Sequence, residues 1–267
     1  MTLIIQKPTG AKLNLAQGWD LSGFDADAAA YIQRVEWADT TPLEAATRTA
    51  INSFVVGCKA DGIWTAIKAS CILSGARTLS GALMPLAGSA PTNVNFVSGD
   101  YNRKTGLVGD GSTKYLDSNR NSNADPQNSF HMTCYRTAGA LGGSQTFIGN
   151  EGGTTSGSSV IIVFGSSVFF RNRNSGAQSV ASTAPNFIGS NRSTSSAYTA
   201  RVDGTTNSYN ISSQTPRNQT ISLFSAPGGG DYSSFRIAFY SIGESLNLAL
   251  LDARVTDLIN AFAAAIP

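Results

Sequence analysis

Hydrophobic positions in the first quarter of the chain recur with the spacing of helices. In a helix predicted between residues 25 and 38, the apolar side chains that share one face are Tyr31, Ile32 and Val35. A second helix is predicted to open at a capping box over residues 41–44, where a threonine precedes a proline and then a glutamate. Its apolar stripe consists of Ile51, Phe54, Val55 and Cys58. Residues 61–67 predict a further short helix, which makes about 50 residues helical.

Beyond Cys71 the pattern changes to short apolar runs separated by Gly, Ser, Thr and Asn, which is typical of strands and turns. Residues 160–164 and 167–170 flank Gly165-Ser166, and a glycine at that loop position suits the positive φ of a hairpin turn. Residues 198–202 lead into a second such turn at Asp203-Gly204. Further strands are predicted at 94–98, 113–118, 129–135, 145–149, 219–224 and 234–242. Strands at this spacing, without helices between them, predict an antiparallel sandwich.

A helix is predicted to close the chain. Its apolar stripe, with spacings of 3, 4, 3 and 4, consists of Leu248, Leu251, Val255, Leu258 and Phe262. One interpretation is a helix that packs onto its own sandwich, and the other is a self-association seam. The stripe spans about two heptads, which is shorter than a coiled coil requires and favours the first interpretation.

Composition and charge narrow the classes of partner. Charged residues make up 13% of the 267 residues, and 19 basic against 17 acidic side chains leave a net charge of +2. A chain with so small a net positive charge lacks the basic surface that binds a phosphate backbone, so no nucleic-acid partner is expected. Residues 1–7 lack the features of a signal peptide, and no stretch approaches the ~20 apolar residues of a membrane span, so no membrane insertion is expected.

The numbers of cysteine and histidine residues limit which disulfides and metal sites the chain can form. Cys58, Cys71 and Cys134 are widely spaced and odd in number, which indicates neither a disulfide framework nor a zinc site. His131 is the only histidine, so we expect no metal and no cofactor. Alternation along residues 130–135 predicts a core position for Cys134 and a surface or concave-face position for His131.

Catalytic motifs are not matched. Residues 106–114 resemble a phosphate loop, but Ser112 stands where the lysine must follow the second glycine, so Asp110-Gly111 is better explained as a turn. A nucleophilic cysteine would need His131 beside it on one face, which alternation denies Cys134. With four glutamates far apart and no compact acidic spacing, the chain is predicted not to be an enzyme, although an Asp/Asp glycosidase stays open.

Two polar segments, residues 119–123 and 171–174, are rich in planar hydrogen-bonding groups and are predicted to be loops. Such groups can bind sugar hydroxyls, especially beside an aromatic ring that stacks on an apolar sugar face. A solvated loop without a ligand is the alternative for each segment. The candidate glycan-binding residues are Tyr101, Tyr115, Asn119, Arg120, Arg171, Arg173 and Tyr232.

Several segments follow in the order of a known family: residues 106–117 (GLVGDGSTKYLD), 129–135, the turn at 200–204, and 235–242 before the closing helix. This arrangement resembles the concanavalin A-like, laminin-G-like jelly roll. With residues 3–13 and 56–64 included, it also resembles proteins encoded among tailed-phage virion structural genes. The calcium-ligand pattern of some laminin-G domains is not found here.

The resemblance implies a mainly β protein, an antiparallel concanavalin A-like jelly-roll sandwich after a small N-terminal helical region and before a C-terminal helix. Residues 1–75 would form an extended and helical attachment region, and residues 76–267 the sandwich with its closing helix. It further implies a virion protein that is assembled in the cytoplasm of the bacterial host and contacts other virion structural proteins.

The function implied first is a fibre-like adhesin on tail or head, a homo-oligomer with a trimer favoured, that binds host-surface polysaccharide through multivalency. The alternatives are a non-binding capsid decoration or tail connector protein and, third, a polysaccharide depolymerase.

Overall fold

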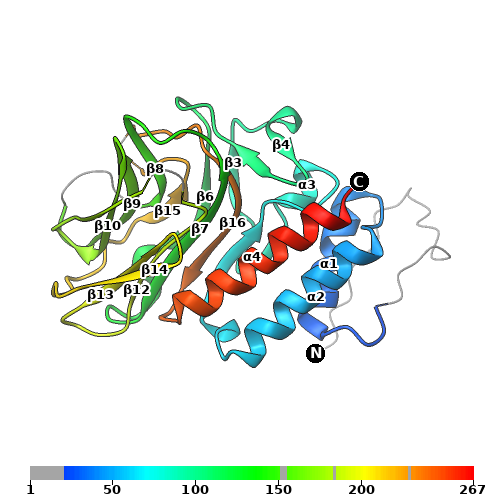
Figure 1. Ribbon diagram of the computed structural model, residues 1–267, viewed down its shortest axis with the longest axis horizontal. Helices are drawn as coiled ribbons and strands as arrows, with labels where there is room; N and C mark the ends of the chain where they lie inside the picture. The colour runs from blue at the N-terminus through cyan, green and yellow to red at the C-terminus, as the bar shows by residue number, and fades with distance from the viewer. Residues whose placement is uncertain (1–20, 151–154, 183–184, 228–229) are drawn as a thin grey trace.

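The computed structural model describes residues 21–150, 155–182, 185–227 and 230–267, which form three layers (Figure 1). Helices α1 (Ala26–Asp39), α2 (Ala45–Ala60) and α4 (Leu248–Ala265) make the first layer. They cover one face of an antiparallel sheet, here called the inner sheet, and a second sheet, the outer sheet, packs on its other face. The predicted antiparallel sandwich with N-terminal helices and a C-terminal helix is confirmed.

All strand pairs among the described residues are antiparallel. In spatial order the inner sheet comprises β14 (Thr205–Tyr209), β13 (Tyr198–Val202), β12 (Phe187–Arg192), β7 (Phe130–Ala138), β16 (Arg236–Gly243), β1 (Ile67–Ile72) and β2 (Pro85–Ala87), with β5 (Gly106–Val108) beside β16 and β4 (Tyr101–Asn102) beside β5. The outer sheet comprises β11 (Gln178–Ala181), β10 (Ser167–Asn174), β9 (Ser158–Phe164), β8 (Ser144–Gly149), β15 (Thr220–Leu223), β6 (Tyr115–Asn121) and β3 (Thr92–Val94).

Two hydrophobic cores hold the layers together. The core between the sheets includes Phe147 stacked on Phe235, with ring centroids 4.2 Å apart. The core between the helices and the inner sheet includes Phe54 against Phe239, with centroids 5.7 Å apart. Because both of its faces are covered, the inner sheet has strands such as β7 that are buried at nearly every position.

The two predicted hairpins are present. Strands β9 and β10 pair from Phe164 opposite Ser167, and Gly165 has φ +60°. Strands β13 and β14 are joined by Asp203 and Gly204 with φ of +50° and +75°, which are the values that this kind of two-residue turn demands. The strands predicted near 113, 129, 145, 219 and 234 correspond to β6, β7, β8, β15 and β16.

Three local expectations about elements are corrected. The capping box at residues 41–44 does not form, because α2 begins at Ala45 and the N–H of Leu43 donates to the buried carboxylate of Glu36 instead (2.8 Å). Residues 61–67 do not continue as a helix: a 3-10 turn, η1 (Trp64–Ala66), leads directly into β1 of the inner sheet. The strand expected over 94–98 is β3, which ends at Val94 before the turn η2 (Ser98–Asp100).

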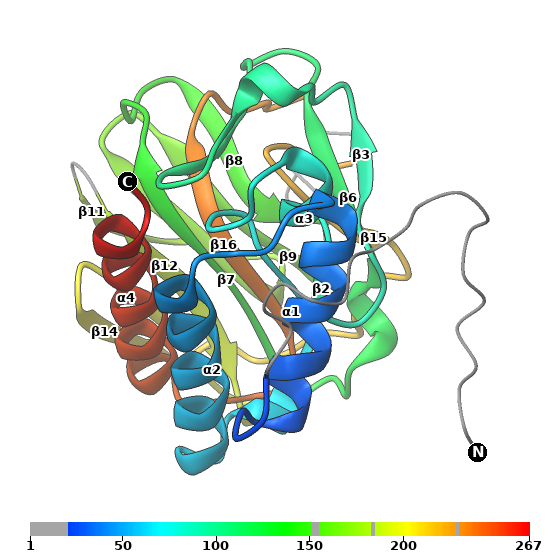
Figure 2. The ribbon, with the colours of Figure 1, turned by 90° about the vertical axis from the view of Figure 1, so that its right-hand side faces the viewer.

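The apolar stripe of α4 lies inside the chain's own core. Its five members are at most 4% exposed: Leu248, Leu251, Val255, Leu258 and Phe262. Figure 2 shows α4 lying beside α2 against the inner sheet. The stripe therefore is not available as a self-association seam, and the interpretation as a helix packed on its own sandwich is the correct one.

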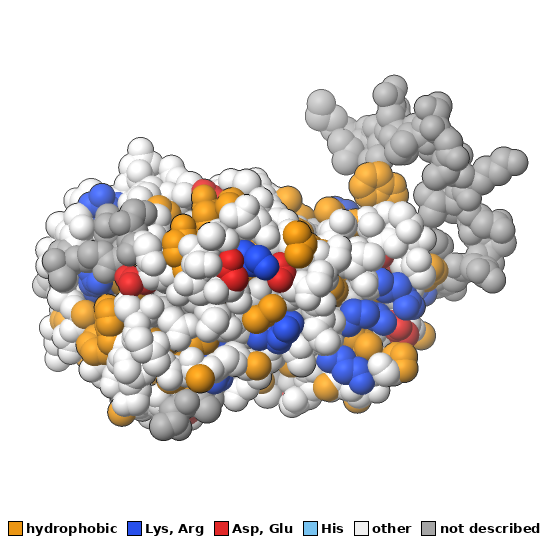
Figure 3. Space-filling model, turned by 90° about the horizontal axis from the view of Figure 1, so that it is seen from above, with side chains coloured by type: hydrophobic (Ala, Val, Ile, Leu, Met, Phe, Trp, Pro, Cys, Tyr) orange, Lys and Arg blue, Asp and Glu red, His pale blue; other side chains and the backbone are white. Residues whose placement is uncertain are grey.

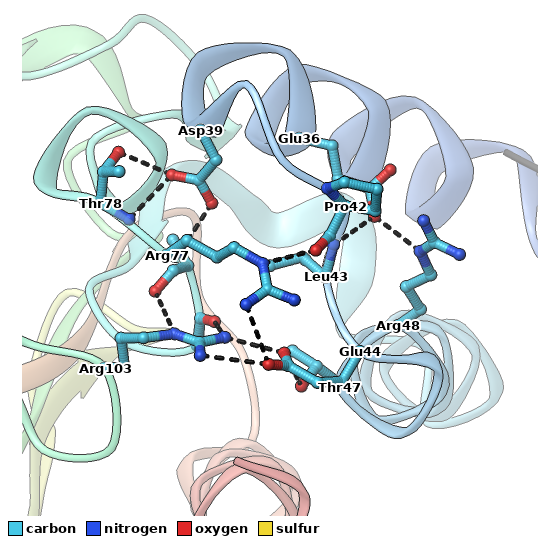
Figure 4. A network of polar contacts seen from close by, with 12 residues as sticks. Glu36, Asp39, Pro42, Leu43, Glu44, Thr47, Arg48, Arg77, Thr78 and Arg103 are labelled. Carbon is cyan, nitrogen blue, oxygen red and sulfur yellow. Dashed lines mark hydrogen bonds and ion pairs between the residues drawn. The ribbon is translucent and has the colours of Figure 1, made fainter. Parts of the chain in front are cut away.

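Polar contacts fasten the helical layer to the sandwich (Figure 4). The carboxylate of Asp39, 3% exposed, accepts hydrogen bonds from the backbone N–H groups of Arg77 and Thr78 at 2.6 and 2.9 Å. Glu44 forms ion pairs with both Arg77 (3.2 Å) and Arg103 (2.8 Å), so the start of α2 is held by two loops of the sandwich. This contact, together with β1, ties residues 21–75 to the rest of the fold, whereas the extended segment expected before them lies outside the described residues. A separate attachment role for them stays a prediction.

Charge is distributed unevenly over the layers. On the face seen in Figure 3, Lys and Arg side chains gather over the helical end at the right, and smaller groups of basic and acidic side chains lie over the sandwich. Among the described residues, no helix is long and apolar enough to cross a membrane.

Candidate functional site

A cavity of about 390 Å³ opens on the outer sheet, on the face turned away from the inner sheet. It lies where β6 and β15 meet the segment that follows β15. Its lining, here called the tyrosine cavity, consists of Tyr115, Asp117, Thr220, Ser222, Ser225, Ala226, Pro227, Gly230 and Tyr232. Two of the predicted glycan-binding residues, Tyr115 and Tyr232, therefore lie in one place although 117 positions separate them.

Strand alternation explains why polar groups reach this cavity. Leu116 on β6 and Leu223 on β15 are paired across the sheet and point into the sandwich core. The next pair, Asp117 and Ser222, must then face the other way, as their place in the cavity lining shows. Register between the two strands thus sets a carboxylate beside a hydroxyl on the open face.

The two tyrosine rings form an aromatic wall. Their centroids are 6.4 Å apart and their planes are tilted by 54°, with both side chains half-buried. No described residue forms a hydrogen bond with either phenol hydroxyl, so these groups are free for a ligand or water. Two tilted rings beside hydroxyl and carboxylate groups can stack on an apolar sugar face while the polar groups bind its hydroxyls.

The polar groups of the cavity are partly engaged. One oxygen of Asp117, Oδ1, accepts the backbone N–H of Asn119 at 2.8 Å, and Oδ2 accepts the hydroxyl of Thr220 at 3.0 Å. Ser222 is 1% exposed, and its Oγ has no hydrogen-bond partner among the described residues. This hydroxyl therefore keeps its capacity to donate and accept a hydrogen bond with a ligand or with water.

Three other predicted residues lie elsewhere. The hydroxyl of Tyr101 donates to the carbonyl of Ala76 (2.8 Å), and burial raises the pKa of Tyr101 above its usual value. Asn119 is exposed at positive φ, and its side-chain amide donates to the carbonyl of Ala90 (2.8 Å). Arg120 forms a bidentate ion pair with Asp125 at 3.0 and 2.5 Å. Each is occupied within the fold, and none lines the tyrosine cavity.

The structure corrects the predicted positions of Arg171 and Arg173. They were expected on a solvated loop, but they lie on strand β10 and are 4% and 0% exposed. The guanidinium of Arg173 stacks 4.1 Å from the ring centroid of Phe130 and donates to the carbonyl of Ser122 at 2.6 Å and to that of Pro126. Burial lowers the pKa of Arg173 to about 10. These contacts close one end of the sandwich, so the side chain is structural.

The predicted surface or concave-face position of His131 is also corrected. It lies on the face of β7 opposite Cys134, as alternation predicts, but that face is covered and its side chain is fully buried. Its Nδ1 lies 2.5 Å from the carbonyl oxygen of Glu244, and Nε2 lies 2.7 Å from Oγ of Ser241. Burial lowers the pKa of His131 to about 4, so the ring is neutral and donates from Nδ1 to the carbonyl.

A larger hollow of about 620 Å³ lies in the helical layer between α2 and α4. Small and apolar side chains dominate its lining, which consists of Ala46, Thr49, Ala50, Ser53, Phe54, Arg254, Asp257, Leu258, Ala261, Ala264 and Ala265. Arg254, one of its two charged lining residues, forms an ion pair with Asp61, so the hollow offers a mainly apolar surface.

The remaining motifs from the sequence analysis have structural roles. Asp110 accepts the backbone N–H groups of Ser112, Thr113 and Lys114 at 2.8–3.0 Å, which confirms the predicted turn in place of a phosphate loop. No group of three or more metal-ligating side chains occurs in the part of the chain that the structure describes. The three cysteines are free and buried.

Sequence reasoning missed Asp117, Thr220 and Ser222 as site residues. Part of the signal is in the sequence, because alternation along the predicted strands 113–118 and 219–224 indicates which residues within each strand share a face. What the sequence did not show is that these two strands are neighbours.

Comparison with known proteins gives fold information alone. No family model and no curated protein matches the chain. Among solved structures, the binding domain of botulinum neurotoxin DC in complex with rat synaptotagmin II is similar at 14% identity and a TM-score of 0.50, over 74% of this chain and 52% of that one. Trypanosoma rangeli sialidase matches at 12% identity and a TM-score of 0.47, over 73% and 33% of the two chains. Botulinum neurotoxin type C, whose cell entry depends on interaction with two ganglioside molecules, matches at 14% identity and a TM-score of 0.42, over 58% of this chain and 42% of that one. The match spans about half or less of the length of each of these three solved chains.

Proposed function

We propose that this chain is a carbohydrate-binding adhesin that holds host-surface polysaccharide in the tyrosine cavity. The observation that supports the proposal is the combination of two tilted tyrosine rings with Asp117, Thr220 and the unpartnered hydroxyl of Ser222. Aromatic stacking against a sugar ring supplies affinity, and the carboxylate and hydroxyls fix its orientation.

The biological setting belongs to the same proposal. The order of the jelly-roll motifs and the likeness to tailed-phage structural genes support a fibre-like protein that is assembled in the bacterial cytoplasm and displayed on tail or head of the virion. A single sugar-binding cavity binds weakly, so repeated copies, as in a homo-oligomer or an array on a particle, would raise the avidity.

A depolymerase is a weaker explanation for the same cavity. Hydrolysis of a glycosidic bond uses two carboxyl groups about 5 to 10 Å apart. Asp117 is the only carboxylate among the lining residues that the structure describes. The proposed activity is therefore binding without catalysis.

The second candidate, a capsid decoration or tail connector protein, is favoured by the apolar hollow between α2 and α4, which offers a surface for another virion protein. Immunogold labelling over the whole capsid, together with unchanged adsorption of particles that lack the protein, would favour this candidate over the adhesin.

The test of the adhesin is binding of purified protein to immobilised host-surface polysaccharide. Tyr232→Ala removes one stacking ring and is expected to weaken binding about tenfold, whereas Tyr232→Phe keeps the ring and most of the affinity. Trp37→Ala is the matched control, because Trp37 is a 55% exposed aromatic residue on α1, outside the cavity lining. A thermal unfolding curve for each variant checks that the fold persists. Equal binding by wild type and Tyr232→Ala, or no binding by the wild type, contradicts the proposal.

A further inference from the structure

The tyrosine cavity has an unbalanced charge. Asp117 is the one charged side chain in its described lining, which contains neither lysine nor arginine. The two cations nearest to it in sequence are engaged elsewhere, because Lys114 forms an ion pair with Asp100 at 2.6 Å and Arg120 forms one with Asp125. A ligand in this cavity therefore meets a carboxylate without a compensating cation among the lining side chains.

The geometry of Asp117 favours ligands that donate hydrogen bonds. Each carboxylate oxygen accepts one hydrogen bond from the protein, which leaves further lone pairs on both atoms. Ser222 is paired with Asp117 across the two strands, and its Oγ, which has no partner among the described residues, can act as one more donor and acceptor. Sugar hydroxyls and protonated amines satisfy such a site, whereas the carboxylate of an acidic sugar brings only acceptors.

The charge of Asp117 also favours a positively charged ligand over a negatively charged one. Two like unit charges about 5 Å apart repel by enough, even at the dielectric constant of water, to weaken binding about fourfold, and by more where the site is partly closed. An ammonium group at the same place is attracted to the same extent. The partly buried position of Asp117 strengthens both effects relative to a fully exposed carboxylate.

We infer that the tyrosine cavity selects against acidic sugars and prefers amino sugars with a free ammonium group over their neutral N-acetylated counterparts. The inference rests on the proposed function and adds to it the charge class of the ligand.

The experiment compares three soluble oligosaccharides of equal length by isothermal titration calorimetry: glucosamine oligomers, N-acetylglucosamine oligomers and galacturonate oligomers. We expect wild-type protein to bind the first at least fourfold more tightly than the second, and the third most weakly. Asp117→Asn keeps the shape and an acceptor for the N–H of Asn119 but removes the charge. In this variant we expect the preference for the free amine to fall at least fourfold and the acidic oligomer to bind better. Asp257→Asn, the same charge change on an exposed position of α4, is the matched control.

Two kinds of failure can be distinguished. If no oligosaccharide binds the wild type, or Tyr232→Ala leaves binding unchanged, the proposed function fails. If sugars bind and Tyr232→Ala weakens them, but galacturonate oligomers bind as tightly as glucosamine oligomers or Asp117→Asn leaves the ratio unchanged, the charge selectivity alone is overturned. A preference that disappears equally in Asp257→Asn would assign it to the net charge of the protein and would also overturn the inference.

Discussion

The buried histidine makes folding stability depend on pH in a way that can be isolated. His131 is the only histidine of the chain, and burial lowers its pKa to about 4 from an unfolded value near 6.5. Between these values the unfolded chain binds a proton that the native protein does not bind. The free energy of unfolding therefore falls as the pH is lowered from above 6.5 towards 4, and this contribution is fully present only above 6.5.

The magnitude follows from the two pKa values. The full effect is about 3 kcal/mol, because each unit of difference corresponds to about 1.4 kcal/mol. Between pH 7.5 and pH 5.0 the loss from this one group is about 2 kcal/mol. Carboxyl groups with lowered pKa, such as Asp25 and Glu44, lose their contributions mainly at lower pH, so this window reports chiefly on the histidine.

The perturbation is His131→Asn. The amide of asparagine places a donor near the position of Nδ1, so the hydrogen bond to the carbonyl of Glu244 can persist while the titrating group is removed. The variant is expected to be less stable at pH 7.5, because Oγ of Ser241 loses its partner. The informative quantity is the slope of stability against pH, which should become nearly flat between pH 7.5 and 5.0.

The assay is urea unfolding of both proteins at several pH values, with a proton NMR titration of the single imidazole in the native wild type. We expect the imidazole signals not to shift above pH 5. A native-state pKa of 6 or higher, or equal slopes for wild type and His131→Asn, would refute the reasoning and would mean that the ring is hydrated or reaches solvent.

Two stability predictions concern the contacts that hold the helical layer. Leu251→Ala should lower the free energy of unfolding by about 2 to 5 kcal/mol, because it leaves a cavity between α4 and the inner sheet; light scattering should show an unchanged solution mass, since the residue is buried within the chain. A change of oligomeric state in this variant would instead restore the seam interpretation. Asp39→Ala should cost about 3 kcal/mol or more in urea unfolding, because it leaves the N–H groups of Arg77 and Thr78 without their acceptor. A loss below 1 kcal/mol would show that water replaces this carboxylate readily.

Local patterns in the sequence predict most of the elements. The Gly165-Ser166 and Asp203-Gly204 turns need positive φ, few residues adopt it cheaply, and the flanking β-branched and aromatic residues leave little alternative to hairpins. The closing helix is similarly determined by its apolar stripe. Where prediction failed locally, a tertiary contact decided the outcome: Glu44 turns to Arg77 and Arg103 and not to a capping box.

The burial of polar residues was harder to predict, because it depends on which layer covers which sheet. Alternation places His131 on the face opposite Cys134, but no local signal says that α4 and its neighbours cover that face. Arg173 was predicted on a loop because four consecutive polar residues are typical of loops. Instead β10 continues, and Arg173 finds backbone carbonyls and the ring of Phe130 inside the end of the sandwich. A long polar side chain with enough acceptors can be buried, and the sequence does not list those acceptors.

The layer arrangement also decides where a ligand can bind. The inner sheet is covered on one side by helices and on the other by the outer sheet, and its strand β7 is buried at seven successive positions from Phe130 to Arg136. Strand β6 of the outer sheet instead alternates between the sandwich core and a partly open face. A strand that alternates in this way can hold Asp117 at a surface cavity while the adjacent residue, Leu116, packs in the sandwich core. A strand that is buried on both faces, such as β7, cannot do so. Rigid strands hold a site more accurately than loops do, so the outward positions of β6 and β15 are where substitutions should change binding without unfolding the protein.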